Sequence, residues 1–241
     1  MSGFSTGQDD AELRATLTEV TTATATALLV QRGYPNAYMS EARPIQAGAR
    51  ACGRAVTIRF GPIRPDLAVR LEDRTAHMWQ AIESLSLGDV LVIDCGGDTR
   101  GGTVGDILAA RIKRLGGVGV LIDGAIRDPA QIRELVGLPA WARGTHGSGY
   151  PPYLVSLDWG RPVRCFGVTV LPGDYILADD DGAVAIPATL AVEVAEAGVE
   201  TERKETFIRG LVEEGESIKD VYPPNEATLR RYEASKREAG R

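Results

Sequence analysis

Three charged side chains stand at the two ends of a segment that begins after a glycine-rich loop. Asp106 follows the loop 96–105, GGDTRGGTVG, and Arg127 and Asp128 follow the apolar run 118–124. An arginine can hold a carboxylate through two parallel hydrogen bonds, and an aspartate can bind a hard divalent cation directly or through water. The glycines let backbone N–H groups approach a ligand closely. The set therefore predicts a site for an anionic ligand and a metal ion.

Each of these residues also has an ordinary structural explanation. Asp128 begins the sequence Asp-Pro-Ala-Gln, which suits a helix N-cap with Pro129 at the first position and Gln131 as capping-box partner. Arg127 could form a surface ion pair worth about 0–1 kcal/mol, and Asp106 could cap its own helix. The loop has neither the Gly-Lys-Ser/Thr of a Walker A loop nor a GxGxxG pattern. Convergence of the three charged residues on one edge is what favours a site.

Two buried strands and the helix between them must position this set. The runs 89–97 and 118–124 are compact, apolar and rich in β-branched residues, as in strands buried on both faces. Between them, 106–115 predicts a helix that Gly116 ends, with one apolar face formed by Leu108, Ile112 and Leu115. A right-handed parallel crossover is the default for this unit. It brings the strand ends and the helix N-terminus to the edge where open α/β sheets bind ligands.

The remaining segments predict a mixed α/β protein, for which we favour a single domain over residues 1–241. The expected elements are a helix over 9–32 ended by Gly33, a strand over 49–60, a short helix over 77–85, a mixed β region over 161–187 with turns at 172–173 and 181–182, and a helix over 187–215 with Gly198 as its weak point. The charged tail 217–241 is expected to fray or to pack on a neighbouring subunit.

The composition and net charge of the sequence limit the classes of partner that we expect for the protein. The net charge of −6 argues against a nucleic-acid groove, which usually carries a basic face. Cys52, Cys95 and Cys165 are isolated, without the spacing of a zinc site or the density of a disulfide framework. The N-terminus contains no leader-like apolar core, and no run reaches about 18 apolar residues. We therefore expect a cytoplasmic protein with neither nucleic-acid nor membrane partners.

The segments 101–128, GGTVGDILAARIKRLGGVGVLIDGAIRD, and 172–187, PGDYILADDDGAVAIP, resemble the class II pyruvate aldolases that act on 4-hydroxy-4-methyl-2-oxoglutarate. That family also contains the RraA regulators of ribonuclease E. The resemblance extends from about residue 18 to residue 215, and the twenty residues between Asp106 and Arg127 are its most specific feature. It implies an RraA-like α/β fold, an αββα sandwich with a swivelling β/β/α core, assembled as a homotrimer or as a hexamer of two trimers.

The resemblance also implies roles for individual residues. Asp128 matches the aspartate that binds Mg²⁺ or Mn²⁺, Arg127 matches the arginine that contacts the substrate, and Asp106 lies near the metal-bound waters. Glu205, or Glu202 one turn earlier, matches a glutamate that the adjacent subunit adds to the metal site. The backbone amides that hold the pyruvyl carboxylate match a turn formed by Gly105, Asp106, Ile107 and Leu108.

The implied activity is the cleavage of a C–C bond in a 4-hydroxy-2-keto acid to release pyruvate, with oxaloacetate decarboxylation through the same pyruvate enolate. We find no lysine placed for a Schiff base, which disfavours class I chemistry. Two alternatives remain open: a non-catalytic regulator that binds a ribonuclease or helicase, and a methyltransferase that uses S-adenosylmethionine.

The segment 143–162 departs from the aldolase pattern, because it is longer and more aromatic. Four of its side chains could line the mouth of the pocket and recognise a different substrate tail, or could belong to an ordinary surface loop. They are Arg143, His146, Tyr150 and Tyr153.

Overall fold

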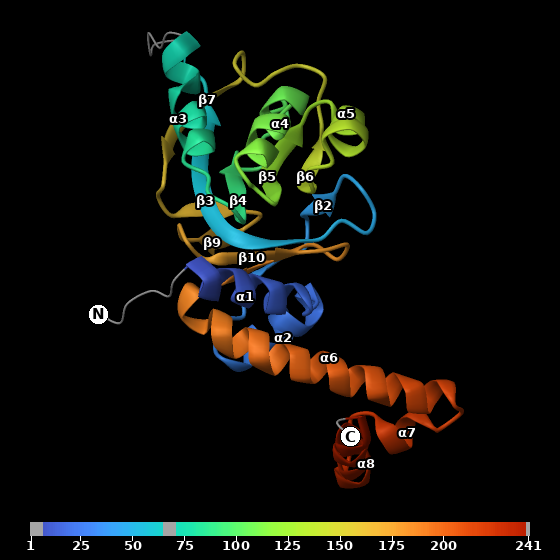
Figure 1. Cartoon of the computed structure of the whole chain (residues 1–241). Helices are drawn as coiled ribbons and strands as arrows, with labels where there is room; N and C mark the ends of the chain where they lie inside the picture. The colour runs from blue at the N-terminus through green and yellow to red at the C-terminus, as the bar shows by residue number, and fades with distance from the viewer. Residues whose placement is uncertain (1–6, 65–70, 240–241) are drawn as a thin grey trace.

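The computed structural model describes residues 7–64 and 71–239 (Figure 1). Residues 1–6, on which part of the prediction of no leader rests, lie outside the described residues. The strands are β1 Tyr38–Met39, β2 Arg43–Pro44, β3 Ala51–Pro62, β4 Asp89–Asp94, β5 Gly119–Ile126, β6 Ala140–Thr145, β7 Leu154–Trp159, β8 Val163–Cys165, β9 Val168–Val170, β10 Tyr175–Ala178 and β11 Ala183–Ile186. The helices are α1 Gly7–Thr18, α2 Thr22–Gln31, α3 Leu71–Glu83, α4 Asp106–Arg114, α5 Pro129–Gln131, α6 Ala191–Glu213, α7 Ile218–Val221 and α8 Glu226–Ala239, with a π-helical turn at Ile132–Val136.

Strands β3, β4, β5 and β6 are parallel neighbours and form the centre of the sheet. The long strand β3 pairs with β10 through its first residues and with β7 through its last ones, both antiparallel. Strand β3 therefore belongs both to the parallel part of the sheet and, through β10, to the antiparallel β10–β11 unit. The predicted parallel crossover from β4 through α4 to β5 is confirmed, and Asp94, the last residue of β4, lies opposite Asp123 of β5, which continues to Ile126.

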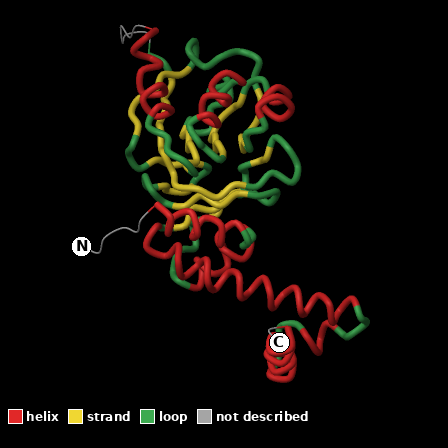
Figure 2. Tube along the Cα trace, viewed as in Figure 1, coloured by secondary structure: helices red, strands yellow, loops and turns green. Residues whose placement is uncertain are grey.

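The layers follow from three apolar clusters. On one face of the parallel sheet, Ile93 and Ile122 pack with Met78 of α3 and Ile112 of α4. On the other face, Val92 and Leu121 pack with the β8–β9 hairpin and with β10 and β11. Helices α1, α2 and α6 cover the outer side of β10 and β11. Figures 1 and 2 show α3 and α4 on one outer side of the strands and α1, α2 and α6 on the other, which is the predicted αββα arrangement.

The N-terminal and C-terminal helices differ from the sequence-based expectation. The prediction of a single helix over 9–32 is wrong, because α1 ends at Thr18 and a second helix, α2, begins at Thr22. Oγ1 of Thr21 caps α2 by accepting the N–H of Thr24. Gly198 is not a weak point of α6. A Cβ at this position would lie 2.6 Å from Cγ2 of Val20, so the absence of a side chain at this buried glycine allows α6 to pack closely against Val20. Beyond the sheet α6 continues outward, with α7 and α8 at its far end (Figure 1).

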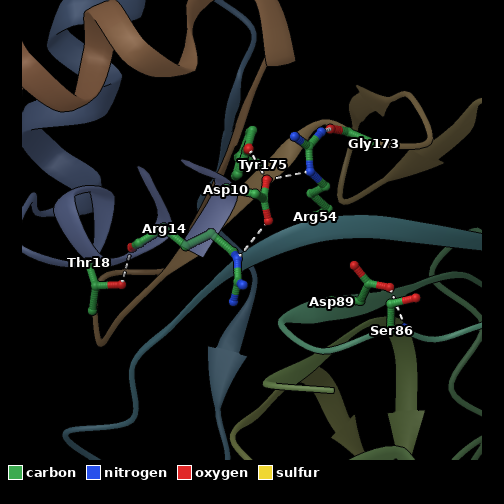
Figure 3. Close-up of polar contacts among 8 residues, drawn as sticks. All are labelled: Asp10, Arg14, Thr18, Arg54, Ser86, Asp89, Gly173 and Tyr175. Carbon is green, nitrogen blue, oxygen red and sulfur yellow. Dashed lines mark hydrogen bonds and ion pairs between the residues drawn. The ribbon is translucent and has the colours of Figure 1, made fainter. Parts of the chain in front are cut away.

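Asp10 joins α1 to the sheet. Its Oδ1 accepts hydrogen bonds from Nε of Arg54 at 2.6 Å and from the hydroxyl of Tyr175 at 2.5 Å, and its Oδ2 accepts from Nε of Arg14 at 3.0 Å. Figure 3 shows Asp10 between these three side chains. Burial alone raises the pKa of Asp10, but the hydrogen bonds from Tyr175, Arg54 and Arg14 outweigh it and hold that pKa below its ordinary value.

We expect Asp10→Ala to lower the free energy of unfolding at pH 7 by about 3 kcal/mol, because two arginines lose their shared partner in a largely buried place. A lowered folded-state pKa contributes stability above the unfolded value, and the contribution is lost as pH falls through the folded pKa. Urea denaturation at pH 7 and near pH 3 measures this, and the deficit of the variant should shrink at the lower pH. Glu226→Ala, at an exposed ion pair, should change stability by less than about 0.5 kcal/mol. An equal deficit at both pH values would contradict this assignment.

Candidate active site

Three loops meet at the carboxyl ends of β4, β5 and β6. Gly102 forms bridges with both Ala125 and Gly149, and the N–H of Thr103 donates to the carbonyl of Ala125 at 3.0 Å. The N–H of Arg127 donates to the carbonyl of Val104 at 2.8 Å. The glycine-rich loop therefore runs between the end of β5 and the loop after β6, and its position is fixed by backbone hydrogen bonds on both sides.

Arg127 and Asp128 form an ion pair at this junction. Nε of Arg127 donates to Oδ2 of Asp128 at 2.9 Å, and the side chains are 39% and 33% exposed. The two Nη atoms of Arg127 have no hydrogen-bond partner among the described residues. The predicted ion pair of Arg127 thus exists, but it uses only one edge of the guanidinium. The other donors remain free to bind an anion.

Asp128 does not act as the predicted capping residue. Its backbone is left-handed, with φ 55° and ψ 43°, and its side chain makes no capping hydrogen bond. The capping box with Gln131 is therefore wrong, and α5 ends there before the π-helical turn begins. A non-glycine residue in this conformation is uncommon, and such strained positions gather at functional sites. The conformation places the Asp128 carboxylate beside Arg127 instead of over the helix.

Gly105 makes the close approach of this pair possible. A Cβ at Gly105 would lie 2.9 Å from Oδ2 of Asp128 and 3.2 Å from Nη2 of Arg127. At Gly102 a Cβ would lie 2.7 Å from Cβ of Arg127. Both glycines therefore create the space that the ion pair occupies, which explains part of the glycine content of the loop.

Helix α4 begins at the same place. Its N-cap is Gly105, which has no side chain, so the predicted capping role of Asp106 is wrong. Oδ1 of Asp106 instead accepts the N–H of Ile107 at 2.9 Å. First-turn amides of a helix lack intrahelical acceptors and carry partial positive charge. The amide of Ile107 is satisfied by Asp106, and the other first-turn amides lie next to Arg127, an arrangement that suits an anion.

A cavity of about 470 Å³ includes Arg127 in its lining. It is lined by Trp79, Gly102, Thr103, Gly105, Ile107, Leu108, Arg127, Gly149, Tyr150 and Pro151. The predicted residues Gly105, Ile107, Leu108 and Arg127 are thus brought together around one space. Asp106 and Asp128 do not line the cavity, although each directly adjoins a residue that does.

Only one of the four candidates in the long loop lines this cavity. Tyr150 is buried, and its hydroxyl has no partner in the described part of the chain; burial raises its pKa to about 12. Arg143 bonds instead to the carboxylates of Asp123 and Glu41. His146 and Tyr153 contact each other edge to face, with ring centroids 6.2 Å apart.

The oxygen donors suit an open site for a hard cation. Mg²⁺ is commonly held by one or two carboxylates, with water or substrate oxygens completing its shell. Oδ1 of Asp128 has no hydrogen-bond partner among the described residues, and the Asp106 carboxylate stands on the residue after Gly105. Across the ranges that the structure describes, no three acidic, histidine or cysteine side chains gather closely enough to enclose a metal. One chain therefore offers a partial donor set.

The two glutamates of α6 have different surroundings. Oε1 of Glu202 accepts the N–H of Thr21 at 2.9 Å and its hydroxyl at 2.8 Å, so this side chain is engaged in packing α6 against α2. Glu205 is exposed. Helix α6 lies on the opposite side of the strands from α4 (Figure 1), so within one chain Glu205 is remote from Arg127. The predicted role of Glu205 requires a neighbouring subunit.

Trp79 is one of the lining residues that the sequence analysis did not predict. It lies on α3, where its neighbours Met78, Ala81 and Ile82 face the core, and it is 45% exposed. An aromatic residue off the apolar face of a predicted amphipathic helix was the available signal. Gly149 and Pro151 were missed for another reason, since the register of the loop is set by the bridge to Gly102.

The protein is thus a mixed α/β protein of αββα architecture, with an arginine–aspartate pair at the end of a parallel strand, the edge at which open α/β sheets bind ligands. A match to the RraA-like family, described as Aldolase/RraA, covers residues 15–185. The protein belongs to the RraA-like family.

Relatives in this family carry two kinds of name. The 4-hydroxy-4-methyl-2-oxoglutarate aldolase of Thermus thermophilus is 33% identical over 145 residues, 58% of this chain and 77% of the relative. A relative from Halalkalibacterium halodurans that carries the same aldolase name provisionally is 36% identical over 108 residues, 45% of this chain and half of its own length. The crystal structure of Streptomyces coelicolor RraAS2, described as an unusual member of the RNase ES inhibitor RraA family, has 35% identity and a TM-score of 0.75, covering 87% of this chain and 99% of that one.

No helix in the described part of the chain has the length and apolar character needed to cross a membrane. The three cysteines, Cys52, Cys95 and Cys165, are buried and unpaired.

Proposed function

We propose that the protein is a divalent-metal-dependent lyase that cleaves a 4-hydroxy-2-keto acid to release pyruvate and decarboxylates oxaloacetate through the same enolate. The observation that carries the proposal is Arg127, which lines the cavity and whose Nε donates to Asp128, while its two Nη atoms have no hydrogen-bond partner among the described residues. The relatives named as aldolases support the choice of reaction.

Arg127 and the first turn of α4 are the groups that bind the negative charge. The carboxylate of a 2-keto acid is held by the Nη donors and by the amides of the turn 105–108 that Asp106 leaves available, since the amide of Ile107 donates to Asp106. This orients the bond to be broken within the site. As that bond breaks, negative charge moves onto the keto oxygen. Donors already aimed at this position stabilise the enolate without reorganisation.

A bound Mg²⁺ or Mn²⁺ supplies Lewis-acid stabilisation of the same charge. The residues that would hold it are Asp128, Asp106 through water, and Glu205 of a neighbouring subunit, which makes a homotrimer or hexamer part of the proposal. The reaction needs the proton of the C4 hydroxyl to leave as that carbon becomes a carbonyl. We assign Asp106 to this transfer, through water, because it directly follows Gly105, which lines the cavity.

A regulatory function is the second candidate. The similarity to RraAS2 covers most of the chain and favours it. In that case the acidic surface, with a net charge of −6, would bind a ribonuclease or helicase and the cavity would turn nothing over.

Pyruvate release from oxaloacetate and from 4-hydroxy-4-methyl-2-oxoglutarate tests the proposal. We expect turnover of at least one substrate with Mg²⁺ or Mn²⁺, and loss of that turnover with excess EDTA that added metal restores. Arg111→Ala, at an exposed ion pair on the last turn of α4, is the control variant and should keep the activity. No pyruvate from either substrate, with binding to a ribonuclease, would favour the regulator. Turnover that persists in EDTA would contradict the metal dependence.

A further inference from the structure

Apart from Arg127, the lining of the cavity is largely apolar, and four of its apolar side chains come from three separate elements. Trp79 comes from α3, Ile107 and Leu108 from the first turn of α4, and Pro151 from the loop after β6. Trp79 is 45% and Ile107 76% exposed. Large apolar side chains left in water around one cavity mark a binding surface rather than a part of the core.

We propose that the part of the substrate beyond C4 is uncharged and apolar, and that Trp79, Ile107, Leu108 and Pro151 select it. This inference rests on the proposed function. It adds the substrate class: 4-hydroxy-2-keto acids with a single carboxylate and an aliphatic or aromatic tail.

The distribution of charge carries the argument. Among the described residues that line the cavity, Arg127 is the one with a charged side chain, and it is taken up by the carboxylate next to the keto group. A second carboxylate beyond C4 would lie against the indole and aliphatic side chains, where it loses water and finds no second cation of the same chain. Two nearby arginines already form ion pairs, Arg100 of the glycine-rich loop with Asp98 and Arg143 of β6 with Asp123.

The volume of the cavity is large enough for a substrate with a tail beyond C4. Cavities of about 300–1,000 Å³ hold ligands the size of drugs, so about 470 Å³ leaves room beyond a three-carbon keto acid. An apolar tail on the substrate would cover the exposed surfaces of Trp79 and Ile107, which a pyruvyl group alone would not do.

The reaction is balanced without a further reactant. The C3–C4 bond breaks, its electron pair forms the pyruvate enolate, and the C4 hydroxyl loses its proton to become a carbonyl. A proton then returns to C3. The products are pyruvate and an apolar aldehyde or ketone, and nothing is oxidised or reduced.

Two substrates of nearly equal size separate an apolar from a charged tail. In 4-hydroxy-4-methyl-2-oxohexanoate an ethyl group stands where 4-hydroxy-4-methyl-2-oxoglutarate has a carboxylate. Cleavage gives pyruvate plus butanone from the first and two pyruvates from the second. We expect kcat/KM for the ethyl compound to be at least about tenfold higher, since pocket contacts to one such group discriminate by about 10–200-fold.

Variants of the wall make the test specific. Trp79→Ala should bring the ratio of the two kcat/KM values toward one, and Trp79→Arg should invert it, because the new cation can pair with the second carboxylate. Leu135→Ala, at an exposed apolar residue outside the cavity, should leave the ratio unchanged. A wild-type preference for the dicarboxylate, or a ratio that neither change at Trp79 moves, would overturn the inference.

Oxaloacetate and sedimentation distinguish the other outcomes. If oxaloacetate is decarboxylated while the ethyl compound is not preferred, the tail inference fails and the proposed lyase function stands. If no substrate gives pyruvate with metal, the proposed function fails and the tail inference with it. Sedimentation of Trp79→Ala should match that of the wild type. A variant that dissociates would show that this surface is instead covered by a second copy of the chain, and would also overturn the inference.

Discussion

Arg127→Ala should lower kcat/KM for pyruvate release by about 10³-fold while the protein remains folded. The change removes both free Nη donors from the cavity and leaves the charge of the substrate carboxylate and of the enolate oxygen without its nearest cation. Losing a single such donor costs about 10²–10³-fold in other enzymes. Steady-state kinetics with oxaloacetate, together with thermal unfolding, measure the effect.

Arg127→Lys separates charge from geometry. Lysine keeps the positive charge but has no planar fork, so it cannot hold Asp128 and a substrate carboxylate at once. We expect it to recover only a small part of the lost activity. A lysine variant with wild-type kcat/KM would mean that the charge alone acts at this position, which would contradict the arrangement described for Arg127.

Gly105→Ala should have the second largest effect, a fall of about 10²-fold in kcat/KM. The added Cβ would lie 2.9 Å from Oδ2 of Asp128 and 3.2 Å from Nη2 of Arg127, so the ion pair must move. Displacements of about 1 Å at a reacting group cost about this much. The backbone of Gly105 is extended, so an alanine is not strained there and the unfolding temperature should change little.

Gly147→Ala is the matched control, because a Cβ at that loop position meets nothing within 4 Å. Its kcat/KM should equal that of the wild type. If Gly105→Ala were as active as this control, the close approach of Gly105 to the Arg127–Asp128 pair would have no bearing on turnover.

The unit that carries the site was predictable from local patterns. Two apolar β-branched runs, a helix ended by Gly116 and the parallel default fix the positions of Asp106 and Arg127 at one edge, and the structure has them there. The helix break at Thr21 was not predictable in the same way. It depends on Glu202, which is distant in the sequence and accepts the N–H and hydroxyl of Thr21.

Only part of the site could be predicted from the sequence: the conformation of Asp128 and the apolar lining of the cavity could not. Asp-Pro-Ala-Gln is a good capping sequence, and nothing local shows that Asp128 takes a left-handed backbone and turns to Arg127. The apolar wall was hidden because it is assembled from α3, α4 and a loop whose register depends on the Gly102–Gly149 bridge. Contacts between distant segments decide both features, and periodicity within one segment does not report them.

The central claim is that the Arg127 site forms a pyruvate enolate. Proton NMR of pyruvate in D₂O tests it without any assumption about the substrate tail, because an enolate exchanges the methyl protons for deuterium. We predict that the methyl signal decays with protein and Mg²⁺ or Mn²⁺, that EDTA stops the decay, and that Arg127→Ala slows it to the rate without protein. A methyl signal that persists with folded protein and metal would contradict the account.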